Sequence, residues 1–225
     1  ARALHAAGAV VIVHYHASRR DAETLCAELN RMRPESAHAI GLDLLDTARL
    51  PLLIDSVLDR TGRLDILVNN ASSFYPTLVG AIDEAQWTDL VGTNLKAPLF
   101  LSQAAVPSLR MHGGAIINLI DIHARRPLRA HPVYCTAKAG LAMLTRSLAR
   151  ELGPDVRVNG IAPGSILWPE AGLDESVASQ IVRETALRRQ GTVEDIGDCA
   201  VYLARDAVYV TGEIITVDGG RSLGW

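Results

Sequence analysis

The sequence has 225 residues, of which 48% are apolar and 21% charged, and its net charge is −3. This length suffices for one large α/β domain with a substantial core, and we expect a single domain over residues 1–225. The slight acidic excess argues against a nucleic-acid-binding protein, and every apolar run is too short to span a membrane. The three cysteines, Cys26, Cys135 and Cys199, lack zinc-site spacing, which predicts reduced thiols in a cytoplasmic protein without a metal.

Strand and helix patterns alternate along the whole chain. The predicted elements, in chain order, are a strand at Ala9–Tyr15, a helix at Arg19–Met32, a strand at Ala37–Leu42, a helix at Leu50–Thr61, a strand at Leu64–Asn69, helices at Asp83–Leu90 and Pro98–Met111 with a break between them, a strand at Gly114–Ile120, a helix at His131–Leu152, a strand at Val156–Ile161, helices at Asp174–Ala186 and Val193–Ala204, and a strand at Gly212–Val217. This order predicts a doubly wound, Rossmann-type α/β fold: a parallel sheet with helices on both faces and ligands at the carboxyl ends of its strands.

The chain opens on ARALHAAG, which reads as the tail of a helix. A doubly wound fold normally begins with a strand and a glycine-rich, phosphate-binding loop before that helix. We therefore expect the sequence to be N-terminally incomplete, with its first strand absent. Since that strand would lie between Ala9–Tyr15 and Leu64–Asn69, we expect a gap or a non-native pairing there.

Tyr134 and Lys138 are the strongest candidates for catalysis. Spaced four residues apart on a predicted helix, they share one face. A lysine charge beside a phenol is expected to lower the tyrosine pKa and make Tyr134 a proton donor near neutral pH. Asp121 follows a strand end and completes the group, whereas Asn94, between two helices, is either a further polar site residue or a helix cap. Taken alone, the Tyr–Lys pair could equally belong to a solvated helix face.

The segment after the first predicted strand indicates which nucleotide would bind. NAD-binding folds of this class place a carboxylate at the end of the second strand to bind ribose hydroxyls. Here that position carries no acid before Asp21, and His14–His16 is followed by Ser18, Arg19 and Arg20. This pattern favours a 2′-phosphate, hence NADPH, over the alternative of a solvated basic helix start.

Two aromatic residues are candidates for binding a flat substrate. Phe74 lies just past the end of a predicted strand, where a heteroaromatic ring could stack on it; the alternative is a core side chain. Trp168 lies on the loop Ile166-Leu167-Trp168-Pro169-Glu170, which would close over a substrate; the alternative is packing within the loop.

Several ordered motifs give the chain a resemblance to the short-chain dehydrogenase/reductase family over its whole length. They are Asn69-Asn70-Ala71, Tyr134 with Lys138, Val158-Asn159-Gly160-Ile161-Ala162-Pro163-Gly164, and Val217-Asp218-Gly219-Gly220. The resemblance implies that Asn94, Tyr134, Lys138 and the residue at Asp121 are catalytic. It also implies cofactor contacts from Tyr15, His16, Ser18, Asp43, Leu44, Asn70, Ala71, Ser72, Tyr134, Lys138, Pro163, Gly164 and Ser165.

Within that family the sequence is most similar to the pteridine reductases. The similarity lies in His14-Tyr15-His16-Ala17-Ser18, in the run NNASSFYPT over residues 69–77, and in Asp121, where most of the family has serine. It implies reduction of a C=N bond in a pterin or dihydrofolate by NADPH, with Ser72, Phe74, Asp121, Tyr134 and Trp168 against the substrate. It also implies a homotetramer built on the helices Pro98–Met111 and His131–Leu152.

Three points about cofactor and function stay open. Ala17 stands where the pteridine reductases carry arginine, so Arg19 or Arg20 would have to replace it. A carbonyl reductase of the same family is the nearest rival, although Asp121 speaks against it. A non-catalytic nucleotide-binding protein is the rival from another class, since the sequence contains no glycine-rich loop before its first predicted strand.

Overall fold

Parallel strands and helices alternate along the chain, as the sequence predicts. The computed structural model describes residues 1–168, 172 and 174–224. Its elements are α1 (Arg2–Ala6), β1 (Val11–Tyr15), α2 (Arg19–Met32), β2 (Ala37–Gly41), α3 (Leu50–Thr61), β3 (Ile66–Asn69), α4 (Glu84–Val91), α5 (Ala97–Met111), β4 (Ala115–Leu119), α6 (Pro132–Leu152), β5 (Arg157–Pro163), α7 (Glu175–Glu184), α8 (Val193–Val201) and β6 (Ile214–Val217).

The strands of the described residues form two parallel sheets. β1 pairs with β2, and β3, β4, β5 and β6 pair in that order. No pairing joins β1 to β3 among the described residues, which confirms the predicted gap. In the register of the larger sheet, Asn69 pairs with Asn118 and Leu119 pairs with Ile161. The carboxyl ends of β3, β4 and β5 therefore meet at one edge, where the candidate site lies.

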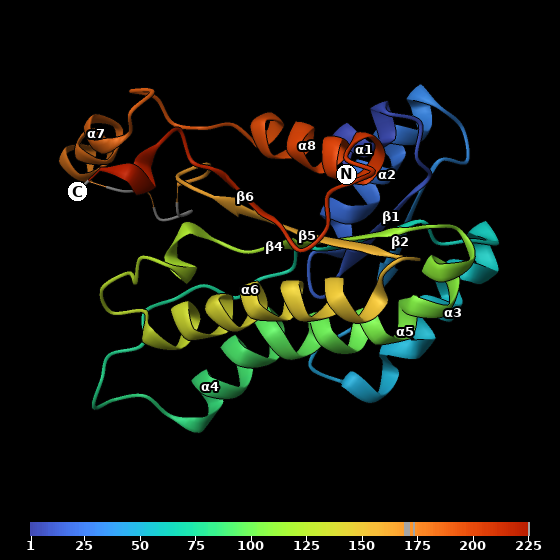
Figure 1. Cartoon of the computed structure of the whole chain (residues 1–225), viewed down its shortest axis with the longest axis horizontal. Coiled ribbons are helices and arrows are strands. Elements are labelled where there is room, and N and C mark those ends of the chain that lie inside the picture. Colours follow the sequence, from blue (N-terminus) through green and yellow to red (C-terminus); the bar gives the residue numbers. More distant parts are fainter. Residues whose placement is uncertain (169–171, 173, 225) are drawn as a thin grey trace.

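Helices cover both faces of the strands, so the fold has three layers (Figure 1). Because successive residues of a strand point to opposite faces, Ile116 packs among residues of α3, α5 and α6, whereas Ile117 packs among residues of α8 and the turn after it. Both isoleucines are fully buried. This burial on two faces explains why the strands read as continuous apolar runs.

The break predicted between the helices Asp83–Leu90 and Pro98–Met111 is wrong. α4 begins at a capping box made by Asp83 and Gln86, and the helical path then continues through a π-helical turn, Gly92–Lys96, directly into α5. A π-helical turn inserts one extra residue per turn, which redirects the side chains that follow. Asn94 lies in this turn and is not a helix cap.

Within the described residues, no helix is both long and apolar enough to cross a membrane.

Candidate active site

Tyr134 and Asp121 form the centre of the candidate site. The loop after β4 presents Asp121, and the first turn of α6 presents Tyr134, whose hydroxyl donates a 2.8 Å hydrogen bond to Oδ2 of Asp121. The other carboxylate oxygen, Oδ1, accepts the backbone N–H of His123 at 2.8 Å. The carboxylate is thus held by its own loop on one side and by the phenol on the other.

The pKa of Tyr134 moves opposite to the sequence-based prediction. Burial and, next, the neighbouring Asp121 carboxylate raise it well above its usual value, because both disfavour a phenolate. The tyrosine side chain is only 4% exposed. The predicted lowering by Lys138 is therefore wrong for this structure, and the phenol keeps its proton throughout the neutral range.

Lys138 lies one helical turn after Tyr134, as predicted, but its ammonium does not bond the phenol oxygen. Its Nζ donates to the backbone carbonyl of Leu119 at 2.9 Å and lies 5.6 Å from the centroid of the Tyr134 ring. The side chain is 3% exposed, and burial lowers its pKa to about 8, an effect that Asp121 partly opposes. Lys138 is therefore a buried cation that titrates near physiological pH.

Asn94 connects the π-helical turn to the segment after β3. Its side-chain amide donates to the carbonyls of Ser73 and Leu90, both at 2.9 Å, and its Oδ1 accepts the hydroxyl of Ser72 at 2.7 Å. The residue is fully buried. With every polar atom of its side chain engaged, Asn94 fixes the position of Ser72 and Ser73 beside the Tyr134–Asp121 pair.

Phe74 lies at the mouth of the same group and is not a core residue. The residue is 48% exposed, and its ring meets the ring of Tyr134 edge to face at a centroid distance of 4.8 Å. The structure thus brings together four predicted site residues from separate parts of the chain: Phe74, Asn94, Asp121 and Tyr134.

Residues that follow β3 and end β5 form an open edge next to this group. Asn70, Ala71 and Ser72 are exposed directly after β3. At the end of β5, Gly164 approaches the backbone of Asp218 so closely that an added Cβ would lie 2.6 Å from the Asp218 side chain, so only glycine fits. The neighbouring Ser165 hydroxyl accepts a hydrogen bond from Arg221, and Pro163 ends the strand.

The second group of predicted nucleotide-binding residues lies at the ends of β1 and β2. Tyr15 ends β1, His16 and Ser18 are exposed before α2, and Nε2 of His16 is 4.0 Å from a carboxylate oxygen of Asp43. Leu44, by contrast, is 8% exposed and packs in the main core with Leu50. Any contact that Leu44 makes with a nucleotide would therefore use its backbone.

Trp168 is half-buried and lines a shallow hollow with Ala178 and Val182 of α7. The aromatic contacts recorded for the described residues do not join it to Phe74 or Tyr134. A substrate contact from Trp168 therefore stays a prediction. Pro169 and Glu170 of the predicted substrate loop lie outside the described residues.

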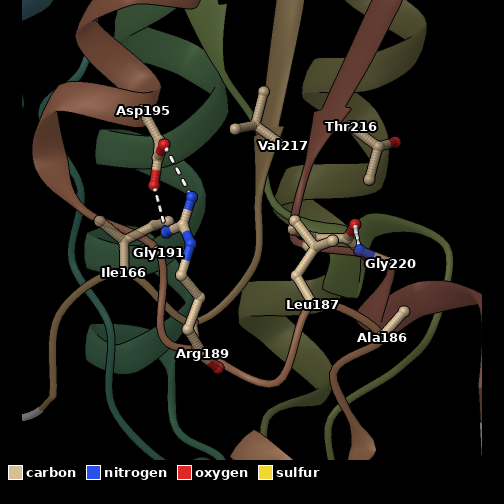
Figure 2. A pocket seen from close by; sticks show the side chains of 12 residues that line it. Ile166, Ala186, Leu187, Arg189, Gly191, Asp195, Thr216, Val217 and Gly220 are labelled. Carbon is tan, nitrogen blue, oxygen red and sulfur yellow. Dashed lines mark hydrogen bonds and ion pairs between the residues drawn. The ribbon is translucent and has the colours of Figure 1, made fainter.

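A pocket of about 390 Å³ lies at the carboxyl end of β6, and Ser165 of the open edge is one of the residues that line it. Figure 2 shows its charged pair: Arg189 donates to both carboxylate oxygens of Asp195, at 2.8 and 3.2 Å. Hydrogen bonds from Arg189 and from the Thr192 backbone lower the pKa of Asp195 to about 2. Since these two charges neutralise one another, neither is free to act on a ligand, and the Tyr134–Asp121 group is the better candidate for an active site.

Three residues around the candidate site were not predicted from the sequence. The imidazole of His131 stacks on Phe74, Asp89 accepts a 3.0 Å hydrogen bond from the Ser73 hydroxyl, and Arg221 binds Ser165. A signal existed for His131, which precedes Tyr134 by three residues and so lies near the same helix face. Asp89 and Arg221 make contacts set by tertiary structure alone.

Comparison with known proteins gives a family match over nearly the whole chain. The family model described as enoyl-(acyl carrier protein) reductase matches residues 1–222. A solved structure described as a short-chain alcohol dehydrogenase, from Sinorhizobium meliloti 1021, superposes with a TM-score of 0.93 at 34% identity, covering 99% of this chain and 90% of that one.

Two relatives of nearly equal similarity carry different activities in their names. Pteridine reductase 1 of Leishmania tarentolae is 36% identical, covering 99% of this chain and 91% of its own length. The 3-oxoacyl-[acyl-carrier-protein] reductase FabG of Staphylococcus aureus is 35% identical, covering 93% of this chain and 87% of its own length. Fold, site geometry and relatives agree that the chain belongs to the short-chain dehydrogenase/reductase family and is an oxidoreductase.

Proposed function

We propose that this protein uses NADPH to reduce a C=N bond in the ring of a pterin, such as a dihydropterin or a dihydrofolate. The observation that carries the proposal is the pairing of Tyr134 with a carboxylate, Asp121, under an exposed aromatic ring, Phe74. Reduction of a C=N bond adds a hydride to the carbon and a proton to the nitrogen, and a phenol backed by a carboxylate can supply that proton. An exposed phenyl ring offers a stacking surface for a flat heterocycle.

The residues at the strand ends fit a dinucleotide. Asn70, Ala71 and Ser72 form an exposed edge after β3, and Gly164 keeps the end of β5 free of a side chain. When bound, NADPH would supply the hydride. Lys138, whose buried ammonium lies one helical turn from Tyr134, would hold the nicotinamide ribose.

Tyr134 carries the proton in this proposal. Its raised pKa keeps the phenol protonated, so it can donate to the ring nitrogen next to the reduced carbon. The phenolate left behind then takes up a proton from solvent, which the Asp121 carboxylate, 2.8 Å from the phenol oxygen, can relay to it. Asn94 acts through Ser72 and Ser73, whose positions it fixes.

We infer NADPH rather than NADH from the start of α2. His16, Ser18, Arg19 and Arg20 are all exposed there, and Arg19 is engaged by Glu23 at 2.7 Å. No ion pair among the described residues holds Arg20, so we assign it the contact with the 2′-phosphate that Ala17 cannot make. His16 would be the second donor.

We also propose a homotetramer in which α5 and α6 of each subunit face their copies. The two helices lie side by side along one face of the molecule (Figure 1). Leu99 and Met143 are exposed on them, at 37% and 60%. Light scattering of the purified protein tests this assembly, and a monomer at micromolar concentration would contradict it.

One comparison of variants tests the pterin assignment against the carbonyl alternative. NADPH oxidation is followed with a dihydropterin and, separately, with a simple ketone, for the unmodified protein and for Asp121→Ser and Phe74→Ala. We expect Asp121→Ser to lose pterin reduction and Phe74→Ala to raise the KM for the pterin severalfold, since aromatic stacking is worth about 1 kcal/mol. Faster turnover of the ketone than of the pterin by the unmodified protein would favour a carbonyl reductase.

A further inference from the structure

His131 makes the closest aromatic contact to the exposed ring of Phe74. The two ring centroids are 4.7 Å apart, and the ring planes differ by 13°, which is a stacked arrangement. Tyr134 meets the same phenyl ring at a centroid distance of 4.8 Å and an interplanar angle of 77°. Two residues therefore fix the Phe74 ring: Tyr134, which is the proposed proton donor, and His131, which has no role in the proposed chemistry.

The His131 ring is itself held in place by its own loop. Its Nδ1 lies 2.8 Å from the backbone carbonyl of Arg129, and because a carbonyl only accepts, Nδ1 must carry the hydrogen. The His131 backbone carbonyl accepts the N–H of Cys135 at 3.0 Å, which ties the residue to the first turn of α6. His131 thus has a fixed tautomer and a fixed position one residue before the helix that carries Tyr134.

The segment that carries Phe74 is anchored through its backbone and its neighbours. Asn94 holds the carbonyl of Ser73 at 2.9 Å, and the backbone N–H of Thr77 donates to the carbonyl of Ala130 at 2.6 Å. These bonds fix where the chain runs but leave the torsion angles of the Phe74 side chain free. Because the residue is 48% exposed, the orientation of its ring depends on the rings beside it.

We propose that His131 is a positioning residue, whose stacked imidazole holds the Phe74 ring as a rigid platform for the flat heterocycle of the substrate. The proposal rests on the proposed pterin function. It predicts that the aromatic ring of His131 matters more than its hydrogen bond to Arg129, which only helps to align that ring. A merely structural role at the start of α6 predicts the reverse.

Two substitutions separate these roles. His131→Phe keeps an aromatic ring and loses the Nδ1–H donor, whereas His131→Asn keeps a side-chain donor and a good helix-capping residue and loses the ring. With a dihydropterin and saturating NADPH, we expect His131→Asn to raise KM about 3- to 10-fold at nearly unchanged kcat. We expect His131→Phe to stay within about twofold of the unmodified KM. A normal KM for His131→Asn, or an equal rise for both variants, overturns the proposal.

A matched control and a double variant complete the test. His112, at the end of α5, also has its Nδ1 on a backbone carbonyl, that of Ser108 at 2.9 Å, and His112→Asn should leave KM unchanged. In a Phe74→Ala background, His131→Asn should raise KM no further, since there is no ring left to position. A full additional rise would mean that His131 acts on the substrate directly, which contradicts a positioning role. If the unmodified protein reduces no pterin, the proposed function itself fails; if it does and the variants disagree, only the role of His131 fails.

Discussion

Replacing Lys138 by methionine should make the stability of the protein respond differently to pH. Burial lowers the pKa of Lys138 from 10.5 to about 8, and the side chain is 3% exposed. Below the lower value the lysine is charged in both the folded and the unfolded state, and the folded state bears the full cost of burying that charge. Between the two values the unfolded state binds more protons, so the free energy of unfolding rises with pH.

The size of this effect follows from the two pKa values. Going from pH 7 to about pH 9.5, Lys138 should add roughly 2 kcal/mol to the free energy of unfolding of the unmodified protein. Lys138→Met removes the titrating group. It also leaves the carbonyl of Leu119 without its donor, a cost that is largely independent of pH and cancels when two pH values are compared.

Denaturant unfolding at the two pH values, without added nucleotide, measures the difference. The unmodified protein should gain about 2 kcal/mol relative to Lys138→Met as the pH rises. Lys96 is exposed on the turn between α4 and α5, and Lys96→Met is the matched control. Its free energy of unfolding should change between the two pH values by the same amount as that of the unmodified protein. If the free energy of unfolding of Lys138→Met also changed by the same amount as that of the unmodified protein, the assignment of a charged, buried lysine would be refuted.

Three further predictions concern the site. Tyr134→Phe should lower turnover about 10²- to 10⁴-fold while leaving the NADPH affinity, measured by fluorescence quenching, unchanged. Asn94→Ala should lower the free energy of unfolding by about 2–4 kcal/mol, because two backbone carbonyls lose their donor, and a denaturant midpoint equal to that of the unmodified protein would contradict this. Ser18→Asp should reduce or reverse the preference for NADPH over NADH in the same binding assay, whereas Arg31→Asp at the other end of α2 should not.

The layered fold could be predicted from the sequence because its strands are short β-branched runs buried on two faces. Ile116 and Ile117 point to opposite sides of the sheet, yet both positions require an apolar residue, so the pattern alone marks the strand. The π-helical turn at Gly92–Lys96 could not be predicted in this way. The helices on both sides of it keep their own periodicity, and one extra residue between them looks like a break.

The candidate site was predictable as a set of residues at strand ends, but not as a set of contacts. Asp121 and Tyr134 are thirteen residues apart, and the strand-to-helix connection between them made their meeting foreseeable. Phe74 and His131 are much farther apart in sequence, and their stacking depends on how the loops before α4 and α6 pack together. Leu44 shows the same limit. It was predicted to contact the cofactor because it follows Asp43, and the sequence did not indicate that its side chain packs in the core.

The pKa of Tyr134 shows why residue types alone did not determine the chemistry. A lysine four residues away suggests a stabilised phenolate, but that effect requires the ammonium to reach the oxygen, and here it binds the Leu119 carbonyl instead. Burial then acts on both groups in the same sense, favouring the neutral form: it raises the pKa of the tyrosine and lowers that of the lysine to about 8. The tyrosine is thereby kept as an acid at every physiological pH, while the lysine becomes the group whose charge changes near neutrality. Any loss of activity as the pH rises past about 8 is therefore expected to arise from deprotonation of Lys138 rather than of Tyr134. The residual activity of Lys138→Met should lack this pH dependence, whereas that of Tyr134→Phe should keep it.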